Sequence, residues 1–249
     1  MSLRAYLASM DASDPEQTLE LLEPDFRFFI SVPGREHSGS SRTDFAAYIA
    51  GRNPVDRRHR VLRHSRDGDV ETVYGVVTEA GKYSGSFQSS AVVAPSGRLA
   101  RYQSFFTTSF ELVDWDGGQG ADSRPGPEPE TAPFLGAWFA ILDSDEPDRI
   151  LDLISDDFSL SILFSTGDGG ATDFAGGREA LVGYLKQRER GTRTHHRLSA
   201  TTLGRDEVFL GEVRRSGVPE ASFVAAGRID GEGRLQRLLI GRSSEIRFS

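Results

Sequence analysis

Two histidines are the first candidates for chemistry in this sequence. His59 and His195 are separated by an offset of 136 in the numbering, and each enters the first of four consecutive strand-like segments. Histidine changes its charge near neutral pH, so either residue could move a proton if a carboxylate oriented its ring. The alternative is a surface histidine in a basic segment. We take Tyr6 and His59 as the candidate catalytic pair, and His195 as a candidate ligand contact.

Aromatic side chains could form the wall of a ligand site near these histidines. A buried tyrosine hydroxyl needs a hydrogen-bond partner, which makes the tyrosines the better candidates, whereas most other aromatic residues are equally well explained as core. Leu238 lies 136 residues after Tyr102 and so occupies the equivalent position near the second histidine. A second pocket, near His195, could therefore be filled by side chains. Besides His195, the candidate ligand-binding residues are Tyr74, Phe87, Tyr102, Phe28 and Trp138.

Three other patterns in the sequence are weaker evidence for a functional site. The basic run around Arg57, Arg58 and Arg60 could steer an acidic ligand or a coenzyme phosphate, or could be a solvated strand edge. Adjacent His195 and His196 would point to opposite faces of a strand, so we expect no metal site. The glycine-rich segment 165–177 lacks the Lys-Ser/Thr ending of a phosphate loop and is better explained as a mobile lid. No cofactor is expected.

The segments that carry these residues occur twice. Gly97–Tyr102 (GRLARY) returns as Gly233–Leu238 (GRLQRL), and the same offset of 136 relates Phe87 to Phe223. Upstream, Asp25-Phe26 and Asp157-Phe158 have a shorter offset of 132, which indicates a four-residue insertion in the second copy. A unit of this length written twice predicts two similar domains.

The order of elements is the same in both copies. Leu3, Tyr6, Leu7 and Met10 have helical spacing, and Asp14-Pro15 begins a second short helix. A strand over 26–30, a helix over 43–50 and four strands joined by short turns follow, which predicts an α+β unit with an antiparallel meander. We expect domains at 1–113 and 133–249, joined by an acidic Gly/Pro-rich linker at 114–132.

Composition narrows the class of protein. The chain has a net charge of −8, which disfavours nucleic acid as a partner because phosphate backbones would be repelled. It contains no cysteine and no signal-peptide pattern, so we expect a cytoplasmic protein. No run of about 18 apolar residues suggests a membrane span.

The ordered motifs resemble the SnoaL-like, nuclear-transport-factor-2-like (NTF2-like) superfamily. The resemblance rests on Tyr6–Asp14, Asp25-Phe26 and Arg42–Ile49 in the first copy, and on Leu142–Asp145 and Gly177–Leu181 in the second. It implies a cone in each copy, made by a strongly curved sheet wrapped around helices and open to a small, mostly apolar molecule. Members of the superfamily include ketosteroid isomerases, polyketide cyclases, dehydratases, epoxide hydrolases and non-catalytic proteins. Fold alone does not choose among them.

Only some of the superfamily's functional residues have counterparts in this chain. Tyr6 matches the hydrogen-bonding tyrosine of the isomerase branch, but Ile30 and Ile162 stand where that branch has its general-base aspartate, and Ser89 or Ala225 where it has its second acid. These differences argue against steroid-isomerase chemistry. The cyclase branch uses an acidic residue on one of the last strands of the sheet. In this chain the middle of those strands contains no acidic residue.

We therefore expect two tandem α+β cones packed as an intramolecular pseudo-dimer, with further association of chains left open. The expected function is binding of a small hydrophobic molecule resembling a polyketide, steroid or terpenoid, with isomerase, cyclase or dehydratase chemistry if Tyr6 and His59 are catalytic. The alternative is a non-catalytic association or scaffold module. An open cavity of about 300 Å³ or more faced by both residues would favour ligand binding.

Overall fold

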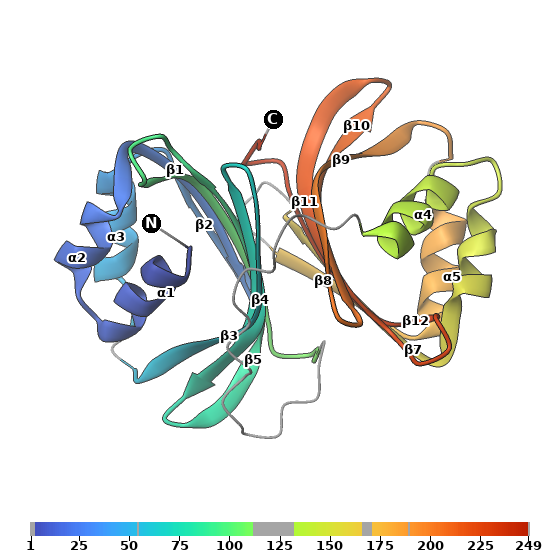
Figure 1. Cartoon of the computed structure of the whole chain (residues 1–249), viewed down its shortest axis with the longest axis horizontal. Coiled ribbons are helices and arrows are strands. Elements are labelled where there is room, and N and C mark those ends of the chain that lie inside the picture. The colour runs from blue at the N-terminus through green and yellow to red at the C-terminus, as the bar shows by residue number, and fades with distance from the viewer. Residues whose placement is uncertain (1–2, 54, 112–131, 166–170, 189, 249) are drawn as a thin grey trace.

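The computed structural model describes residues 3–53, 55–111, 132–165, 171–188 and 190–248, and it contains two six-stranded sheets (Figure 1). The first half consists of α1 (Leu3–Ala12), α2 (Pro15–Glu20), β1 (Leu22–Val32), β2 (Arg35–Gly39), α3 (Arg42–Ala50), β3 (Arg57–Asp67), β4 (Val70–Glu79), β5 (Lys82–Val93) and β6 (Leu99–Thr107). The second consists of α4 (Pro133–Leu142), the 3₁₀ helix η1 (Pro147–Leu153), β7 (Ile154–Ser165), β8 (Ala171–Gly176), α5 (Arg178–Gln187), β9 (Arg193–Leu203), β10 (Asp206–Arg215), β11 (Val218–Ile229) and β12 (Leu235–Ser243).

Both sheets have the same strand order. The first runs β2-β1-β6-β5-β4-β3 and the second β8-β7-β12-β11-β10-β9. In each sheet one pair is parallel, β1 with β6 and β7 with β12, while the other pairs are antiparallel. Each sheet is strongly curved, with its helices on the concave face (Figure 1). The predicted fold class of two tandem α+β cones is confirmed.

Local chemistry explains the short helices. The Asp14 side chain accepts a hydrogen bond from the Gln17 N–H at 3.0 Å, and Pro15 follows at the first helical position. In the second half Glu146 makes no capping bond, and the segment after it forms a 3₁₀ helix in place of the expected α-helix. The equivalent elements therefore differ in helix type where the N-cap differs.

A buried glutamate holds the first helix of each cone at its N-terminus. Glu71 on β4 accepts a hydrogen bond from the Leu3 N–H at 2.6 Å. Glu207 on β10 accepts bonds from the N–H groups of Phe134 and Leu135 at 3.1 and 2.7 Å. The positive end of the helix dipole favours a carboxylate here. These contacts fix α1 and α4 over the sheets.

Two segments differ from the sequence prediction. The loop expected after Pro33 contains β2, which pairs antiparallel with β1. The predicted lid at 165–177 is wrong for 171–176, because these residues form β8 and pair along β7. Residues 166–170 and the predicted linker, except Ala132, lie outside the described residues. The proposed domain boundaries at 113 and 133 remain a prediction.

The two sheets pack against each other through their convex faces, between the two layers of helices (Figure 1). Phe29, Phe105, Leu163, Val224 and Leu239 belong to one buried cluster that spans both halves. Each half has its own separate core between helices and sheet. The halves thus form the expected pseudo-dimer within one chain.

A buried carboxylate lies in this interface. Asp206, on β10 of the second half, accepts a hydrogen bond from the Tyr74 hydroxyl of the first half at 2.6 Å. Arg63 and Arg228 form ion pairs with the same carboxylate, each at 3.1 Å. Burial and the neighbouring Asp206 raise the pKa of Tyr74 well above its usual value, which keeps the hydroxyl a donor. We call these four residues the Asp206 cluster.

Candidate functional site

The first half contains a cavity of about 400 Å³ between α1, α3 and the concave face of its sheet. A volume of this size lies within the range of about 300–1,000 Å³ that is usual for small-molecule sites. Much of its wall is apolar, and the side chains there include Leu7, Ile30, Val77, Phe87 and Phe106. The cavity can therefore hold a molecule with a substantial hydrophobic body.

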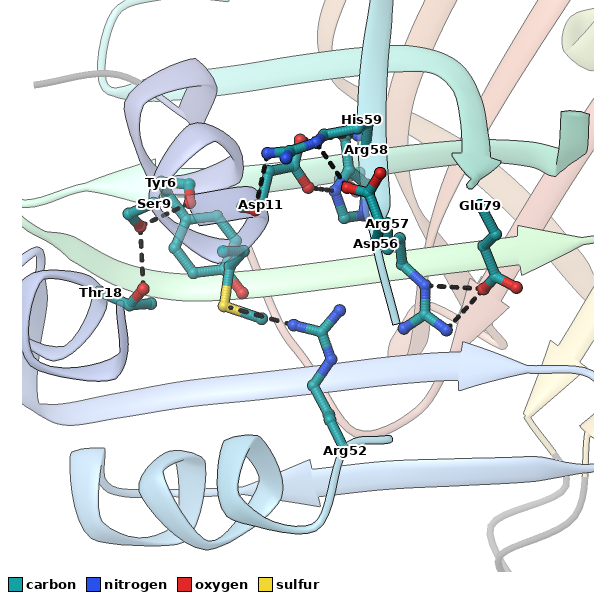
Figure 2. Close-up of polar contacts among 12 residues, drawn as sticks. Tyr6, Ser9, Asp11, Thr18, Arg52, Asp56, Arg57, Arg58, His59 and Glu79 are labelled. Carbon is teal, nitrogen blue, oxygen red and sulfur yellow. Dashed lines mark hydrogen bonds and ion pairs between the residues drawn. The ribbon is translucent and has the colours of Figure 1, made fainter. Parts of the chain in front are cut away.

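His59 and Asp11 form a hydrogen-bonded pair at the wall of this cavity (Figure 2). His59 Nδ1 lies 2.6 Å from Asp11 Oδ1, and the His59 backbone N–H donates to Asp11 Oδ2 at 2.7 Å. Their side chains are only 16% and 13% exposed. Because the carboxylate contacts Nδ1 and the backbone together, it fixes the ring orientation and leaves Nε2 on the side away from Asp11.

A glycine and a phenylalanine complete the packing of His59. The rings of His59 and Phe87 meet edge to face with centroids 5.1 Å apart. Phe87 lies opposite Gly75 of β4, where an added Cβ would be 3.0 Å from the Phe87 ring and 2.0 Å from the Arg60 carbonyl oxygen. The absence of a side chain at Gly75 is therefore required for this arrangement.

Two buried tyrosines face the same cavity. The rings of Tyr6 and Tyr102 have centroids 5.0 Å apart. The Tyr102 hydroxyl lies 3.2 Å from Ser89 Oγ, which donates to Ser104 Oγ at 2.9 Å. Burial raises the pKa of both phenols, and in Tyr6 the neighbouring Tyr102 adds to the effect. Both remain protonated at neutral pH and are able to donate hydrogen bonds.

The second half repeats the pair of histidine and aspartate but not the cavity. His195 Nδ1 lies 2.8 Å from Asp143 Oδ1, and the His195 N–H donates to Asp143 Oδ2 at 2.5 Å. The space beside this pair is only about 40 Å³. Phe139 occupies the position of Leu7, with its ring centroid 4.8 Å from that of His195, and Ile240 occupies the position of Ser104. These larger side chains thus fill the second cone. A filled second pocket was expected, but the expectation rested on Leu238 in place of Tyr102.

The second pair gives a pH-dependent prediction. Burial lowers the pKa of His195 despite the opposing effect of Asp143, so the unfolded state binds more protons below a pH of about 6.5. Stability should therefore fall as the pH is lowered from 7 to 5. The His195→Gln variant is expected to show a smaller loss over this range, measured by urea unfolding. A loss of stability in His195→Gln equal to that of wild type would contradict this prediction. His196→Gln, at the next residue, is the control.

The structure brings together some of the sequence candidates. Tyr6, His59, Phe87 and Tyr102 line the large cavity. Phe28 lies beneath it in the core, with its ring centroid 4.9 Å from that of Phe45. Trp138 and His195 line the small cavity of the second half.

The assignment of Tyr74 as a ligand contact is wrong. Side chains alternate between the two faces of a strand, and Tyr74 lies on the convex face of β4, where it belongs to the Asp206 cluster. Its neighbours Val73 and Val77 lie in the core on the concave side. The hydroxyl does have the partner that its burial requires, but that partner is Asp206 of the other half.

Sequence reasoning missed Asp11 and Asp143. Both lie within the helix motifs that revealed the resemblance, and they are related by the offset of 132 that holds in the upstream part of the repeat. The two histidines have the downstream offset of 136. The sequence did contain a signal for these aspartates: in each copy an aspartate and a histidine recur at the offsets of the duplication.

Structural comparison finds similar chains that each match about half of this one. A chain from Kribbella flavida, provisionally named a ketosteroid isomerase, is 20% identical, with 49% of our chain and 91% of that chain covered and a TM-score of 0.37. A SnoaL-like isomerase, so named provisionally, from Agrobacterium tumefaciens is 14% identical, with coverages of 42% and 92% and a TM-score of 0.36. An LEH-like epoxide hydrolase from Mycobacterium tuberculosis is 13% identical, with coverages of 42% and 79% and a TM-score of 0.35.

Each half of the chain has a cone fold, in which a curved six-stranded sheet carries helices on its concave face. The strand order and the curvature of the sheets carry this assignment, and they agree with the cone fold that was expected from the sequence. No protein-family model matches the sequence, and no curated protein matches it either. In the described part of the chain, no helix is long and apolar enough to cross a membrane. Those residues also include no group of three or more side chains suited to hold a metal ion.

Proposed function

We propose that the first cone binds a small, largely hydrophobic molecule and that His59 transfers a proton to or from it. The observation that carries the proposal is the His59–Asp11 pair at the wall of a cavity of about 400 Å³. A histidine held by a carboxylate is suited to general acid–base catalysis near neutral pH. The filled second cone offers no comparable space, so we assign the activity to the first.

The arrangement supports a reaction in which a proton moves while charge develops on an oxygen atom. His59 would act as the base or acid through Nε2, with Asp11 holding the orientation of the ring. The hydroxyls of Tyr6 and Tyr102 are the protonated donors available to a carbonyl or hydroxyl oxygen of the ligand. Isomerisation, cyclisation and dehydration can each use a proton-transferring group together with such donors. Ile30, at the cavity wall, supplies no carboxylate for steroid-isomerase chemistry.

The alternative of a scaffold without a ligand has less support. A protein-association surface usually presents a contiguous apolar patch. Among the described residues, the exposed large hydrophobic side chains are Val55 and Val218, which lie in different halves. The open first cavity exceeds the size that we set for favouring ligand binding.

The proposal is tested by thermal-shift screening against steroids, polyketides and terpenoids, followed by turnover assays on the compounds that bind. His59→Gln is expected to lower turnover at least about 100-fold, the usual contribution of a positioned acid or base. Tyr6→Phe should lower turnover less and leave the protein folded. His196→Gln, in the second half, is the matched control and should retain full activity. Unchanged turnover in His59→Gln would rule out the assigned role.

A further inference from the structure

The wall of the first cavity has a one-sided charge. It includes three arginines and two histidines, and none of the described residues that line it is aspartate or glutamate. The chain as a whole carries a net charge of −8, so this bias runs against its composition. This lining therefore favours a negatively charged group on the ligand, although Asp11 and Glu79 pair with His59 and Arg57.

Arg52 has no carboxylate partner within the part of the chain that the structure describes. It follows the C-terminal end of α3, and its side chain extends toward α1 and Tyr6 (Figure 2). Nη1 lies 3.9 Å from the sulfur of Met10, and the guanidinium carbon lies 6.0 Å from the centre of the Tyr48 ring. Nε is buried and has no hydrogen-bond partner among the described residues. Such a guanidinium has unused donors for an anion.

The second cone shows what the same arginine does when no ligand space remains. Arg188 is the counterpart of Arg52 at the downstream offset of 136, and it is directed to the same place on its own first helix. Its Nη1 donates to the Leu142 carbonyl, and its Nη2 forms an ion pair with Asp143 at 3.0 Å. Asp11 contacts His59 as Asp143 contacts His195, but Arg52 does not reach Asp11 as Arg188 reaches Asp143, and it is left beside the cavity.

We infer that the ligand of the first cone carries a carboxylate on its hydrophobic body and that Arg52 binds this group; the inference rests on the proposed function of the cavity. Arg57 also lines the cavity, but Glu79 already neutralises it through bonds of 3.0 and 2.7 Å. Arg35 also lines the cavity, but it is exposed and solvent screens its charge, whereas Arg52 is half-buried. Arg52 alone therefore matches a single negative charge better than the double charge of a phosphate monoester. The ligand's acid would lie at Arg52, and its apolar part would lie toward Ile30 and Phe87.

The test compares acids with neutral amides of the same shape. Binding of 2-naphthoate and 2-naphthamide, and of dodecanoate and dodecanamide, is measured by isothermal titration calorimetry on the full chain. Each acid is expected to bind at least about 10-fold more tightly than its amide, because a charge-assisted bidentate contact is stronger than a neutral one. Arg52→Gln should remove this preference, mainly by weakening the binding of the acids. Arg60→Gln removes the same charge from an exposed position on β3 and should keep the preference.

The remaining outcomes separate this inference from the proposed function. Equal binding of acid and amide, or a preference that survives in Arg52→Gln, would overturn the assignment of Arg52 while leaving the cavity as a ligand site. Tighter binding of 2-naphthyl phosphate than of 2-naphthoate would overturn the choice of carboxylate. Failure of all four probes to bind would also contradict the inference, whereas the library screen and the His59→Gln assay judge the proposed function independently.

Discussion

Replacement of Asp206 by alanine is expected to lower the free energy of unfolding by about 3 kcal/mol, because it leaves buried partners without their acceptor. The Asp206 side chain is fully buried and is contacted by Tyr74, Arg63 and Arg228. Removing one member of a buried ion pair costs about 3–5 kcal/mol. The two arginine side chains are 26% and 27% exposed, so they can recover some hydration, which places the effect at the lower end.

Urea unfolding followed by tryptophan fluorescence measures this loss. Tyr74→Phe removes one hydrogen bond but leaves the carboxylate between its two arginines, so its cost should be smaller, about 1–2 kcal/mol. Asp145→Ala removes an exposed acid from the second half and is the matched control, expected within about 0.5 kcal/mol of wild type. An Asp206→Ala variant as stable as this control would show that the cluster does not stabilise the pairing of the halves.

Replacement of Gly75 by alanine is expected to cost about 3 kcal/mol and to disturb the candidate site as well, since overpacking against backbone is poorly relieved. The added methyl group would lie 2.0 Å from the Arg60 carbonyl oxygen and 3.0 Å from the Phe87 ring. The strand would have to move away from β3, and Phe87 would be displaced from His59. Ligand affinity and stability should therefore fall together.

Gly183→Ala is the control for this change. Gly183 lies within α5, and a Cβ there would meet nothing within 4 Å. Alanine is favoured over glycine in a helix, so this variant should be as stable as wild type or more stable by up to about 1 kcal/mol. Denaturant midpoints of the two variants give the comparison. Equal stability of Gly75→Ala and wild type would mean that the strand adapts to the methyl group without cost.

Much of the fold was predictable from the sequence because its signals are local or repeated. Asp14-Pro15 specifies the start of a helix through its own side chain and ring, and the short turns between strands specify a meander. The recurrence of Gly97–Tyr102 as Gly233–Leu238 predicted two copies of one unit. β2 was missed because its side chains do not alternate between apolar and polar, and its pairing with β1 depends on contacts outside the segment.

The candidate site was predictable only in part, because strand orientation and distance between elements are not encoded locally. Tyr6 and His59 were selected by type and position, and the structure places both at one cavity. Tyr74 was selected by the same reasoning, but its strand turns it to the other face. The role of Asp11 depends on how α1 crosses β3, which no spacing within either element specifies. Whether a cone has an open cavity depends on small differences in side-chain volume, such as that between Leu7 in the first cone and Phe139 at the equivalent position of the second.

The Asp206 cluster occurs once, although the halves are related by duplication. The positions equivalent to Tyr74 and Asp206 are Leu210 and Val70, so the mirrored contact does not exist. Two identical chains related by a twofold axis would make every such contact twice or not at all. Joining the copies in one polypeptide removes that constraint, and each copy becomes free to specialise. In this chain the interior of the second copy is nearly filled, while the first copy keeps a cavity of about 400 Å³.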